Sequence, residues 1–352
     1  MAIENNNNKV LNVPALRFPE FTEEWNYESL DTIAPNITSG RSKPSLGEYN
    51  LYGSTGIIGK TATADYSGDM LLVARVGANA GSLQLVNDSC GITDNTLIIK
   101  PCKLSSHYLY FYLQHYNLNR LVFGSGQPLI TAGMLKKVRI PFGNQLEQKK
   151  IENFLCCIDE RITTQNKIIE KLETLIKGII ETVISSQKSN TAITNCLECN
   201  SSTLQESQVA ENGTFPVYGA TGISGYTEAP DVKGESILIV KDGSGVGTVK
   251  YATGEYSYIG TLNRLTVKEG YCIKYIYFAL QGFSFEQYKT GMAIPHIYFK
   301  DYGKARIYCP SYKLQSTISQ QLSCIESKID VEKRMLSDLL QQKSYLLSQM
   351  FI

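Results

Sequence analysis

The sequence predicts an α+β protein with two repeated, mainly β globular domains, each followed by a long helix. Three observations predict this fold. Part of the chain recurs about 166 residues later, short β-prone apolar runs alternate with Gly, Asn, Ser and Thr, and two stretches of about forty residues carry heptads. A chain of 352 residues also exceeds the size that one hydrophobic core usually supports. We expect the helices to form an antiparallel coiled coil with pseudo-twofold symmetry.

A glycine-rich segment is the clearest part of the repeat. Residues 52–59 (YGSTGIIG) return as 218–225 (YGATGISG), an offset of 166 that keeps three glycines. Further matches follow at nearly the same offset: 71–73 (LLV) with 237–239 (ILI), Gly77 with Gly243, Gly81 with Gly247, Asn95 with Asn263, Leu97 with Leu265, and 137–140 (KVRI) with 304–307 (KARI). A helix is expected at 106–116 and another at 274–281.

The start of the second copy is the weakest part of the match. Residues 188–214 resemble the first copy only where Leu197-Glu198 can be set against Leu30-Asp31. The predicted division is therefore a first globular domain at 1–145, a first helix at 146–187, a second globular domain at 188–312 and a second helix at 313–352.

Heptads define the two long helices. Both stretches lack proline, and their apolar residues alternate steps of three and four, as in a coiled coil. The predicted seam is Ile151, Leu155, Ile158, Ile162, Ile169, Leu172, Ile176, Ile179 and Val183, matched by Ile318, Leu322, Ile325, Ile329, Leu336, Leu339, Leu346 and Met350. Gln165, Glu332 and Lys343 are the polar exceptions.

A helix of about forty residues is a rod of about 60 Å. We expect this pair to act as a ruler that sets the separation and rotation of the two domains. The alternative is a helix pair that serves only for dimerisation, but that gives the second globular copy no use.

Composition narrows the class of protein. The 34 Lys and Arg residues nearly balance 33 Asp and Glu, so any nucleic-acid surface must be local. Residues 1–9 are polar and no long apolar run occurs, which predicts a soluble, cytoplasmic protein. Nine irregularly spaced cysteines fit reduced thiols, and Cys196-x-x-Cys199 lacks the partners of a zinc site.

Motifs of an enzyme are missing. The sequence has three histidines, no GxxxxGK[ST] loop, no Asn-Pro-Pro-aromatic tetrapeptide and no GxSxG elbow. Residues 242–247 (DGSGVG) suggest a nucleotide loop, but their partner 75–81 (RVGANAG) loses the middle glycine and no long helix follows. A tight connection between strands fits both copies better.

These features together resemble the specificity subunits of type I restriction-modification enzymes. The resemblance rests on residues 13–25 (VPALRFPEFTEEW), the repeated Tyr-Gly-x-x-Gly turns, residues 148–151 (QKKI) at the start of a helix, and the duplicated domain-helix plan. It covers essentially the whole chain, and the order and duplication of the motifs make it specific.

The resemblance implies different roles for the globular domains, the helices and the partner subunits. Each globular copy would be a target recognition domain for one half of a split, asymmetric sequence in double-stranded DNA. The helices would be a spacer and a docking site for methyltransferase subunits. This chain would catalyse no reaction and hold no cofactor or metal; AdoMet, ATP and Mg would belong to the methyltransferase and restriction subunits that it directs.

Residues that differ between the copies are the candidates for base recognition. Arg and Lys can pair with guanine, and Asn and Gln with adenine, in the major groove. The candidates are Arg41, Lys43, Arg75, Asn79, Gln84, Gln127, Lys241, Ser244 and Lys250, while Lys60, Lys136, Lys137, Arg139, Lys304 and Arg306 are expected at phosphates. Any single one of them is as well explained as a solvated loop residue.

Two rival functions remain open on the sequence. One is a structural or adhesive coiled-coil protein whose β domains bind carbohydrate or protein, against which the cysteine usage argues mildly. The other is a nuclease with a divergent site, which the lack of a shared carboxylate-lysine cluster disfavours.

Overall fold

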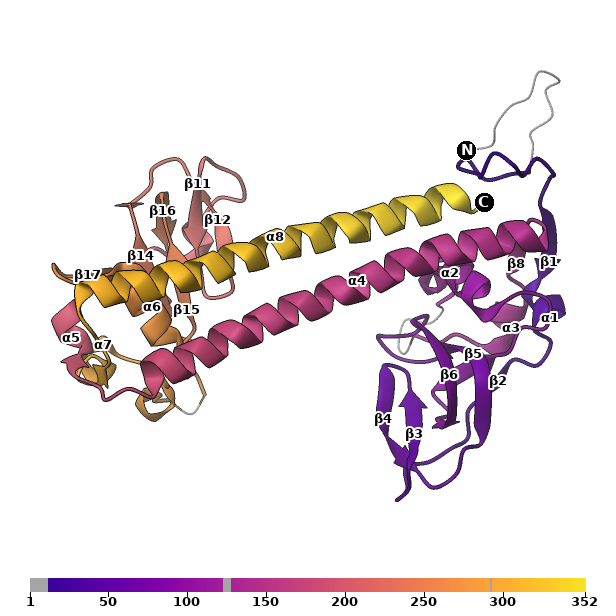
Figure 1. The fold of residues 1–352 in the computed structure, drawn as a ribbon, viewed down its shortest axis with the longest axis horizontal. Coiled ribbons are helices and arrows are strands. Elements are labelled where there is room, and N and C mark those ends of the chain that lie inside the picture. Colours follow the sequence, from indigo (N-terminus) through magenta and orange to yellow (C-terminus); the bar gives the residue numbers. More distant parts are fainter. Residues whose placement is uncertain (1–11, 123–127, 292) are drawn as a thin grey trace. The chain divides into compact units, whose positions relative to one another are not determined.

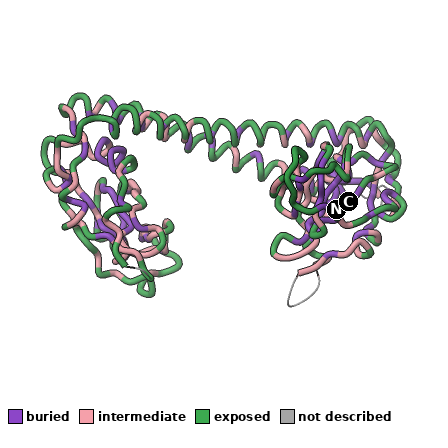
Figure 2. Tube along the Cα trace, turned by 90° about the horizontal axis from the view of Figure 1, so that it is seen from below, coloured by how far each residue is buried: buried purple, intermediate pink, exposed green. Residues whose placement is uncertain are grey.

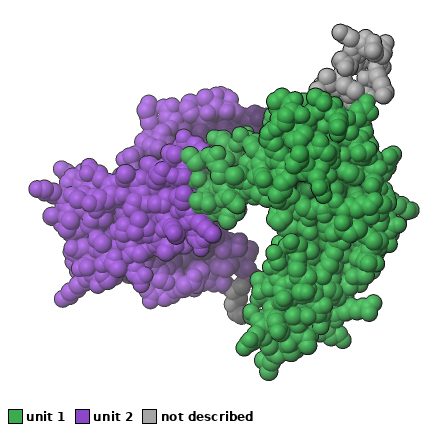
Figure 3. Space-filling view, turned by 45° about the vertical axis from the view of Figure 1, so that its right-hand side comes forward, with its two compact units in different colours: residues 1–165, 335–352 green, residues 166–334 purple. Residues whose placement is uncertain are grey.

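The computed structural model describes residues 12–122, 128–291 and 293–352. It divides into two compact units, which Figure 1 shows as a ribbon and Figure 3 in separate colours. Unit 1 is the chain up to Gln165 together with Met335–Ile352, and unit 2 is Asn166–Arg334. Each unit therefore holds one globular domain and part of both long helices.

Unit 1 is built on a six-stranded sheet with the order β2-β7-β5-β6-β3-β4. Its strands are β2 (Thr38–Ser39), β3 (Tyr49–Gly53), β4 (Gly56–Thr61), β5 (Tyr66–Ala74), β6 (Leu83–Ile92) and β7 (Thr96–Ile99). Met70–Ala74 of β5 are all buried, because one sheet face packs on the main core and the other on a smaller cluster around Leu72. This central strand is the apolar run that the repeat singles out.

Helix α2 (Ser106–Tyr116) covers one face of that sheet. It begins where the Ser105 hydroxyl accepts a hydrogen bond from the Tyr108 backbone N–H, and it ends at Asn117 with φ of 55°. Both ends thus carry caps that their residue types favour. The helix predicted at 106–116 is present.

Unit 2 repeats this sheet with two strands broken. The order β10-β17-β14-β15 matches β2-β7-β5-β6 of unit 1, while β12-β11-β16-β13 forms a second sheet. The strands are β10 (Leu197–Ser201), β11 (Phe215–Tyr218), β12 (Ile223–Thr227), β13 (Val232–Lys233), β14 (Ser236–Val240), β15 (Val249–Ala252), β16 (Glu255–Tyr258) and β17 (Leu262–Val267). The breaks fall at Gly234 and Gly254, which have positive φ values of 109° and 90°.

A two-stranded ribbon and short helices complete each domain. The ribbon is β1 (Asn26–Ser29) with β8 (Arg139–Phe142) in unit 1, and β9 (Thr191–Ala192) with β18 (Arg306–Ile307) in unit 2. The remaining short elements are α1 (Leu30–Ile33), η1 (Leu118–Leu121), α3 (Ala132–Lys136), α5 (Ile193–Cys196), η3 (Glu206–Gln208), η4 (Glu286–Tyr288) and α7 (Phe299–Tyr302), with α6 (Ile273–Gln281) as the counterpart of α2.

Backbone hydrogen bonds and strand pairing correct three details of the repeat. Leu30 donates to the Val138 carbonyl as Ile193 donates to that of Ala305, so Leu30 corresponds to Ile193 and not to Leu197. Arg75 donates to the Asn95 carbonyl as Lys241 donates to that of Thr261, so Asn95 corresponds to Thr261 and not to Asn263. Leu97 lies opposite Val73 as Asn263 lies opposite Ile239, so Leu97 corresponds to Asn263 and not to Leu265. Each wrong match paired similar side chains where the fold keeps the backbone position but changes the residue.

The long helices are α4 (Gln145–Ile179), which continues as the π-helical η2 (Ile180–Ser185), and α8 (Tyr312–Met350). The predicted seam is buried or half-buried except at Val183, which is 39% exposed. Ile180 and Ile184 are buried instead. The π turn has more residues per turn than an α-helix, so it moves the buried face by one residue, and the prediction of Val183 was wrong.

Two ion pairs give the direction of the long helices. In unit 1 Lys343 of α8 forms an ion pair with Asp159 of α4 at 2.6 Å, and in unit 2 Lys333 pairs with Glu173 at 2.7 Å. The residue number rises from Asp159 to Glu173 along α4 while it falls from Lys343 to Lys333 along α8. The helices are therefore antiparallel, as predicted. Figure 2 shows the buried residues gathered inside each unit. No helix in the described part of the chain is long and apolar enough to cross a membrane.

The end of α8 is anchored by aromatic rings in unit 1. Phe351 is 3% exposed and lies with its ring centroid 5.5 Å from that of Tyr108, 5.7 Å from that of Tyr112 and 6.4 Å from that of Trp25. The segment before Trp25 is also fixed there, since Leu16 donates to the Gln349 carbonyl. Chain segments that are distant in sequence therefore share one core.

Candidate nucleic-acid interface

Four connections between elements meet in unit 1, and we call them loop cluster 1: residues 53–56, 75–82, 93–95 and 128–130. Backbone hydrogen bonds join them. Gly77 donates to Pro128 at 3.0 Å, Ile130 to Arg75 at 2.9 Å and Arg75 to Asn95 at 2.9 Å. The Ser54 hydroxyl also donates to the Asn95 carbonyl at 3.2 Å. The cluster is thus one hydrogen-bonded surface rather than four independent loops.

Glycines shape the connection between β5 and β6 in this cluster. Gly77 and Gly81 have φ of 77° and 93°, and the Gly81 N–H closes the turn on the Ala74 carbonyl at 2.9 Å. A Cβ on Gly81 would lie 2.7 Å from the Asn119 side-chain oxygen. Both the backbone conformation and the close approach exclude larger residues at Gly81.

Unit 2 contains the same arrangement, which we call loop cluster 2: residues 219–222, 241–248, 259–261 and 293–297. The same three bonds recur, from Gly243 to Pro295, from Ile297 to Lys241 and from Lys241 to Thr261, each at 2.9 Å. Gly243 and Gly247 have φ of 95° and 89°. The connection joins two strands, as expected, and not a strand to a phosphate-binding helix.

The backbone is kept between the clusters while the side chains change. Asn79 and Ser244 are exposed on the 75–82 and 241–248 loops. Arg75 is half-buried, and its Nε has no hydrogen-bond partner among the described residues. Its counterpart Lys241 is also half-buried. Four predicted contact residues therefore lie within the two clusters, and two of them, Arg75 and Lys241, occupy matching backbone positions.

Gln84 and Lys250 lie beside the clusters but bind the protein's own turns. The Gln84 amide donates to the Gly53 carbonyl at 2.8 Å, and Lys250 Nζ donates to the Gly219 and Ala220 carbonyls at 3.3 and 2.7 Å. Burial lowers the pKa of the Lys250 ammonium, because its partners are neutral carbonyls. Both side chains fix the Tyr-Gly-x-x-Gly turn, a role that sequence alone does not indicate.

Other predicted residues lie elsewhere in the domains. Arg41 is exposed between Gly40 and Ser42, which bond to Thr96 and Ile92, so it borders loop cluster 1. Lys43 is exposed farther along, and Lys60 Nζ donates to the Glu48 carbonyl at 3.0 Å. Lys136 forms an ion pair with Asp31 at 2.8 Å. Gln127 lies outside the described residues.

The cations expected at phosphates sit on the two-stranded ribbons rather than in the clusters. Arg139 lies over the Tyr27 ring at 5.0 Å, and Arg306 donates to the Asn190 carbonyl at 2.5 Å. Lys137 and Lys304 are exposed beside them at matching positions. These four residues form a second basic feature common to both domains, at the start of each long helix.

Sequence reasoning missed several side chains of the clusters. Asp94 is exposed in loop cluster 1. In loop cluster 2 His296 pairs with the Thr290 backbone, its ring lies 5.0 Å from that of Tyr298, and Lys300 Nζ is 5.1 Å from the Tyr298 ring. A comparison of the two copies finds positions where the residues are alike. It therefore overlooks His296, which corresponds to Leu129 in the first copy.

A comparison with protein families decides which class of protein carries these clusters. The family model described as type I restriction modification DNA specificity domain matches residues 8–174 and again 193–341. The chain belongs to this family of specificity subunits. The two matched segments contain the two loop clusters, so each copy of the family domain supplies one cluster.

Known specificity subunits are similar over most of their length. A Mycoplasma genitalium protein named as a type I specificity subunit is 27% identical over 309 residues, which are 78% of this chain and 79% of that protein. The crystal structure of a type I S subunit from M. genitalium has a TM-score of 0.71, 20% identity and coverage of 97% and 99%. A chain from a study of assembly and conformational transition in a type I system has a TM-score of 0.54, 15% identity and coverage of 93% and 97%. These two structures share the fold, and the comparisons do not support an adhesive protein.

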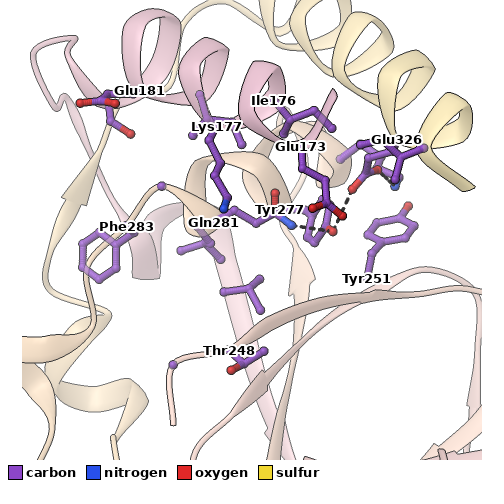
Figure 4. Close-up of a pocket in the computed structure, with 18 of the residues that line it drawn as sticks. Glu173, Ile176, Lys177, Glu181, Thr248, Tyr251, Tyr277, Gln281, Phe283 and Glu326 are labelled. Carbon is purple, nitrogen blue, oxygen red and sulfur yellow. Dashed lines mark hydrogen bonds and ion pairs between the residues drawn. The ribbon is translucent and has the colours of Figure 1, made fainter. Parts of the chain in front are cut away.

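The specificity subunit also has a cavity of about 1040 Å³ in unit 2, between α6 and the two long helices (Figure 4). Glu326 of α8 accepts hydrogen bonds from Lys274 at 3.1 Å and from the Tyr277 hydroxyl at 2.9 Å, and Gln281 donates to the same hydroxyl at 2.7 Å. Lys274 Nζ also lies 3.8 Å from the Tyr251 ring centroid. This network joins α6 to α8 and holds the domain on the helix.

Proposed function

We propose that loop clusters 1 and 2 read the two halves of a split, asymmetric sequence in double-stranded DNA. The chain thereby directs adenine methylation by methyltransferase subunits and cleavage by restriction subunits. It performs no reaction itself. AdoMet, ATP and Mg act in the partner subunits.

One observation carries this proposal: the two clusters keep three cross-loop backbone bonds and the positive φ of two glycine pairs, Gly77 with Gly243 and Gly81 with Gly247, while their side chains differ. A constant scaffold with variable side chains is what two unlike half-sites require. Arg75 and Asn79 in the first cluster stand where Lys241 and Gly245 stand in the second. In the major groove Arg75 and Lys241 can each pair with guanine and Asn79 with adenine, whereas Gly245 offers no side chain, and each good bidentate pair contributes about 1–3 kcal/mol of discrimination.

The cations at the two-stranded ribbons suit contacts with phosphates rather than with bases. Lys137 and Lys304, like Arg139 and Arg306, occupy matching positions in both copies. Identical cations in both domains suit phosphates, which are the same in every sequence. They position each domain on the duplex without contributing to the choice of bases.

The test is a methylation map of DNA modified by the reconstituted complex. We expect Asn79→Ala with Arg75→Ala to relax the first half of the recognised sequence and leave the second half intact. Lys241→Ala with Ser244→Ala should do the reverse. The loss at the affected positions should be on the order of 10- to 100-fold in discrimination, as for one lost bidentate contact.

Lys233→Ala is the matched control, because Lys233 is 84% exposed and pairs with Glu255 outside the clusters. It should leave both halves unchanged. If the cluster variants relax both halves together, or neither, the assignment of one cluster to each half-site is wrong.

A further inference from the structure

Each recognition domain exposes an isoleucine at the same position beside its loop cluster. Ile57 at the start of β4 is 57% exposed, and Ile223 at the start of β12 is 53% exposed. The side chains predicted to read bases differ between the copies, whereas this apolar residue is the same. A shared exposed residue suits a contact that both half-sites have in common.

The hairpins present these isoleucines in the same way. Ile57 is opposite Tyr52 and Ile223 opposite Tyr218, and in both hairpins the register shifts immediately before that tyrosine. The preceding residue is a glycine with positive φ, 116° at Gly56 and 150° at Gly222. Such a bulge redirects side chains and is a feature of functional edges.

The neighbouring residue has a different environment. The Ile58 side chain lies over Gly53, where an added Cβ would be 3.0 Å from it, and Ser224 lies over Gly219 in the second copy. The atoms nearest to these two positions belong to Ile58 in the first copy and to Ser224 and Ile259 in the second, and none belongs to Ile57 or Ile223. Gln84 and Lys250 hold the same turns from the sheet, which fixes the hairpin tips.

We propose that Ile57 and Ile223 each insert as an apolar wedge against the stacked base pairs of duplex DNA. This inference rests on the proposed function. Apolar side chains that wedge between base steps bind without reading a full donor and acceptor code. An isoleucine is suited to this because its χ1 is stiff, and it cannot bind a phosphate. The wedge adds affinity in both half-sites whatever their sequence.

A methyltransferase subunit is the competing partner for these residues. The position of the hairpin tips favours DNA, because the Gly53 to Gly56 turn belongs to the hydrogen-bonded loop cluster. The experiment therefore separates binding to DNA from assembly with partner subunits.

The test compares Ile57→Ala with Ile58→Ala in the complex reconstituted with methyltransferase subunits. Ile58 is 54% exposed, adjacent, and replaced by Ser224 in the second copy, so it is the matched control. We expect Ile57→Ala to weaken binding to target and non-target duplexes alike, by roughly tenfold for the lost apolar contact. The slope of affinity against salt should not change, because no phosphate contact is lost.

A fluorescent adenine analogue that brightens on unstacking reports the wedge itself. Placed in the first half-site, it should brighten with the wild-type complex and less with Ile57→Ala; in the second half-site, Ile223→Ala should have that effect. A changed sequence preference, weaker assembly in the absence of DNA, or unchanged DNA binding each overturns the proposal. A wild-type complex that does not distinguish the two duplexes instead refutes the proposed function.

Discussion

Arg17 and Glu147 form a bidentate ion pair where α4 begins. Arg17 Nε lies 2.6 Å from Glu147 Oε1 and Nη2 lies 2.8 Å from Oε2, and the Glu147 side chain is fully buried. A buried carboxylate that loses its partner is costly, whereas an apolar pair of similar volume is not. This pair attaches the segment before Trp25 to the first long helix.

Arg17→Met should therefore destabilise unit 1 by about 3–5 kcal/mol. The double variant Arg17→Met with Glu147→Met should recover most of that loss, because no charge remains buried. Urea unfolding followed by the fluorescence of Trp25, the only tryptophan, measures both. Equal losses in the single and double variants would show that the pair makes no such contribution.

His115 makes the stability of unit 1 dependent on pH. Burial first, and then the nearby Arg120, lowers the pKa of His115 below its ordinary value. The unfolded chain therefore takes up this proton at a higher pH than the folded chain, so stability falls as the pH drops below about 6.5. Its ring lies 5.9 Å from that of Phe351.

We expect wild-type Tm to fall between about pH 7.5 and about pH 5.5, and to fall less in His115→Asn. Other titrating groups contribute equally to both proteins, so the difference isolates His115. The same fall in both proteins would mean that His115 keeps an ordinary affinity for its proton.

At the scale of elements, the last turn of α8 is anchored in the first domain by Phe351. Phe351→Ala leaves a cavity among Trp25, Tyr108 and Tyr112 and should cost about 3–5 kcal/mol. Trp25 emission should move to the red as its surroundings become wetter. Ile352→Ala is the control, since Ile352 is 40% exposed and should change Tm little.

The long helices and the repeated strands could be predicted because each depends on a local periodic pattern. The heptads fix which face of a helix is apolar, and Gly77 with Gly243 marks a turn that other residues cannot adopt. The π turn at Ile180–Ser185 could not be predicted, because its extra residue is set by how Ile180 and Ile184 pack, not by local propensity.

The candidate site was predictable only in outline. Residue type identified Arg75, Asn79 and Lys241 on the loops, but it also named Gln84 and Lys250, which hold turns. A polar side chain near a glycine turn looks the same in the sequence whether it faces DNA or holds the turn. The two roles differ in the direction in which the donor group of the side chain points. That direction is set by the tertiary structure.

For the whole molecule, the central claim is that two related domains on a continuous pair of helices read two half-sites at a fixed spacing. Both α4 and α8 run from one compact unit into the other. A helix gains about 1.5 Å per residue, so four added residues lengthen it by about 6 Å. That length corresponds to about two base pairs of duplex.

The most direct measurement is a methylation map for a variant with four residues inserted at facing heptad positions of α4 and α8. We predict that both half-sequences persist while the spacer between them changes by about two base pairs. An active complex that modifies sites with the original spacer would contradict the claim that the helices set the distance.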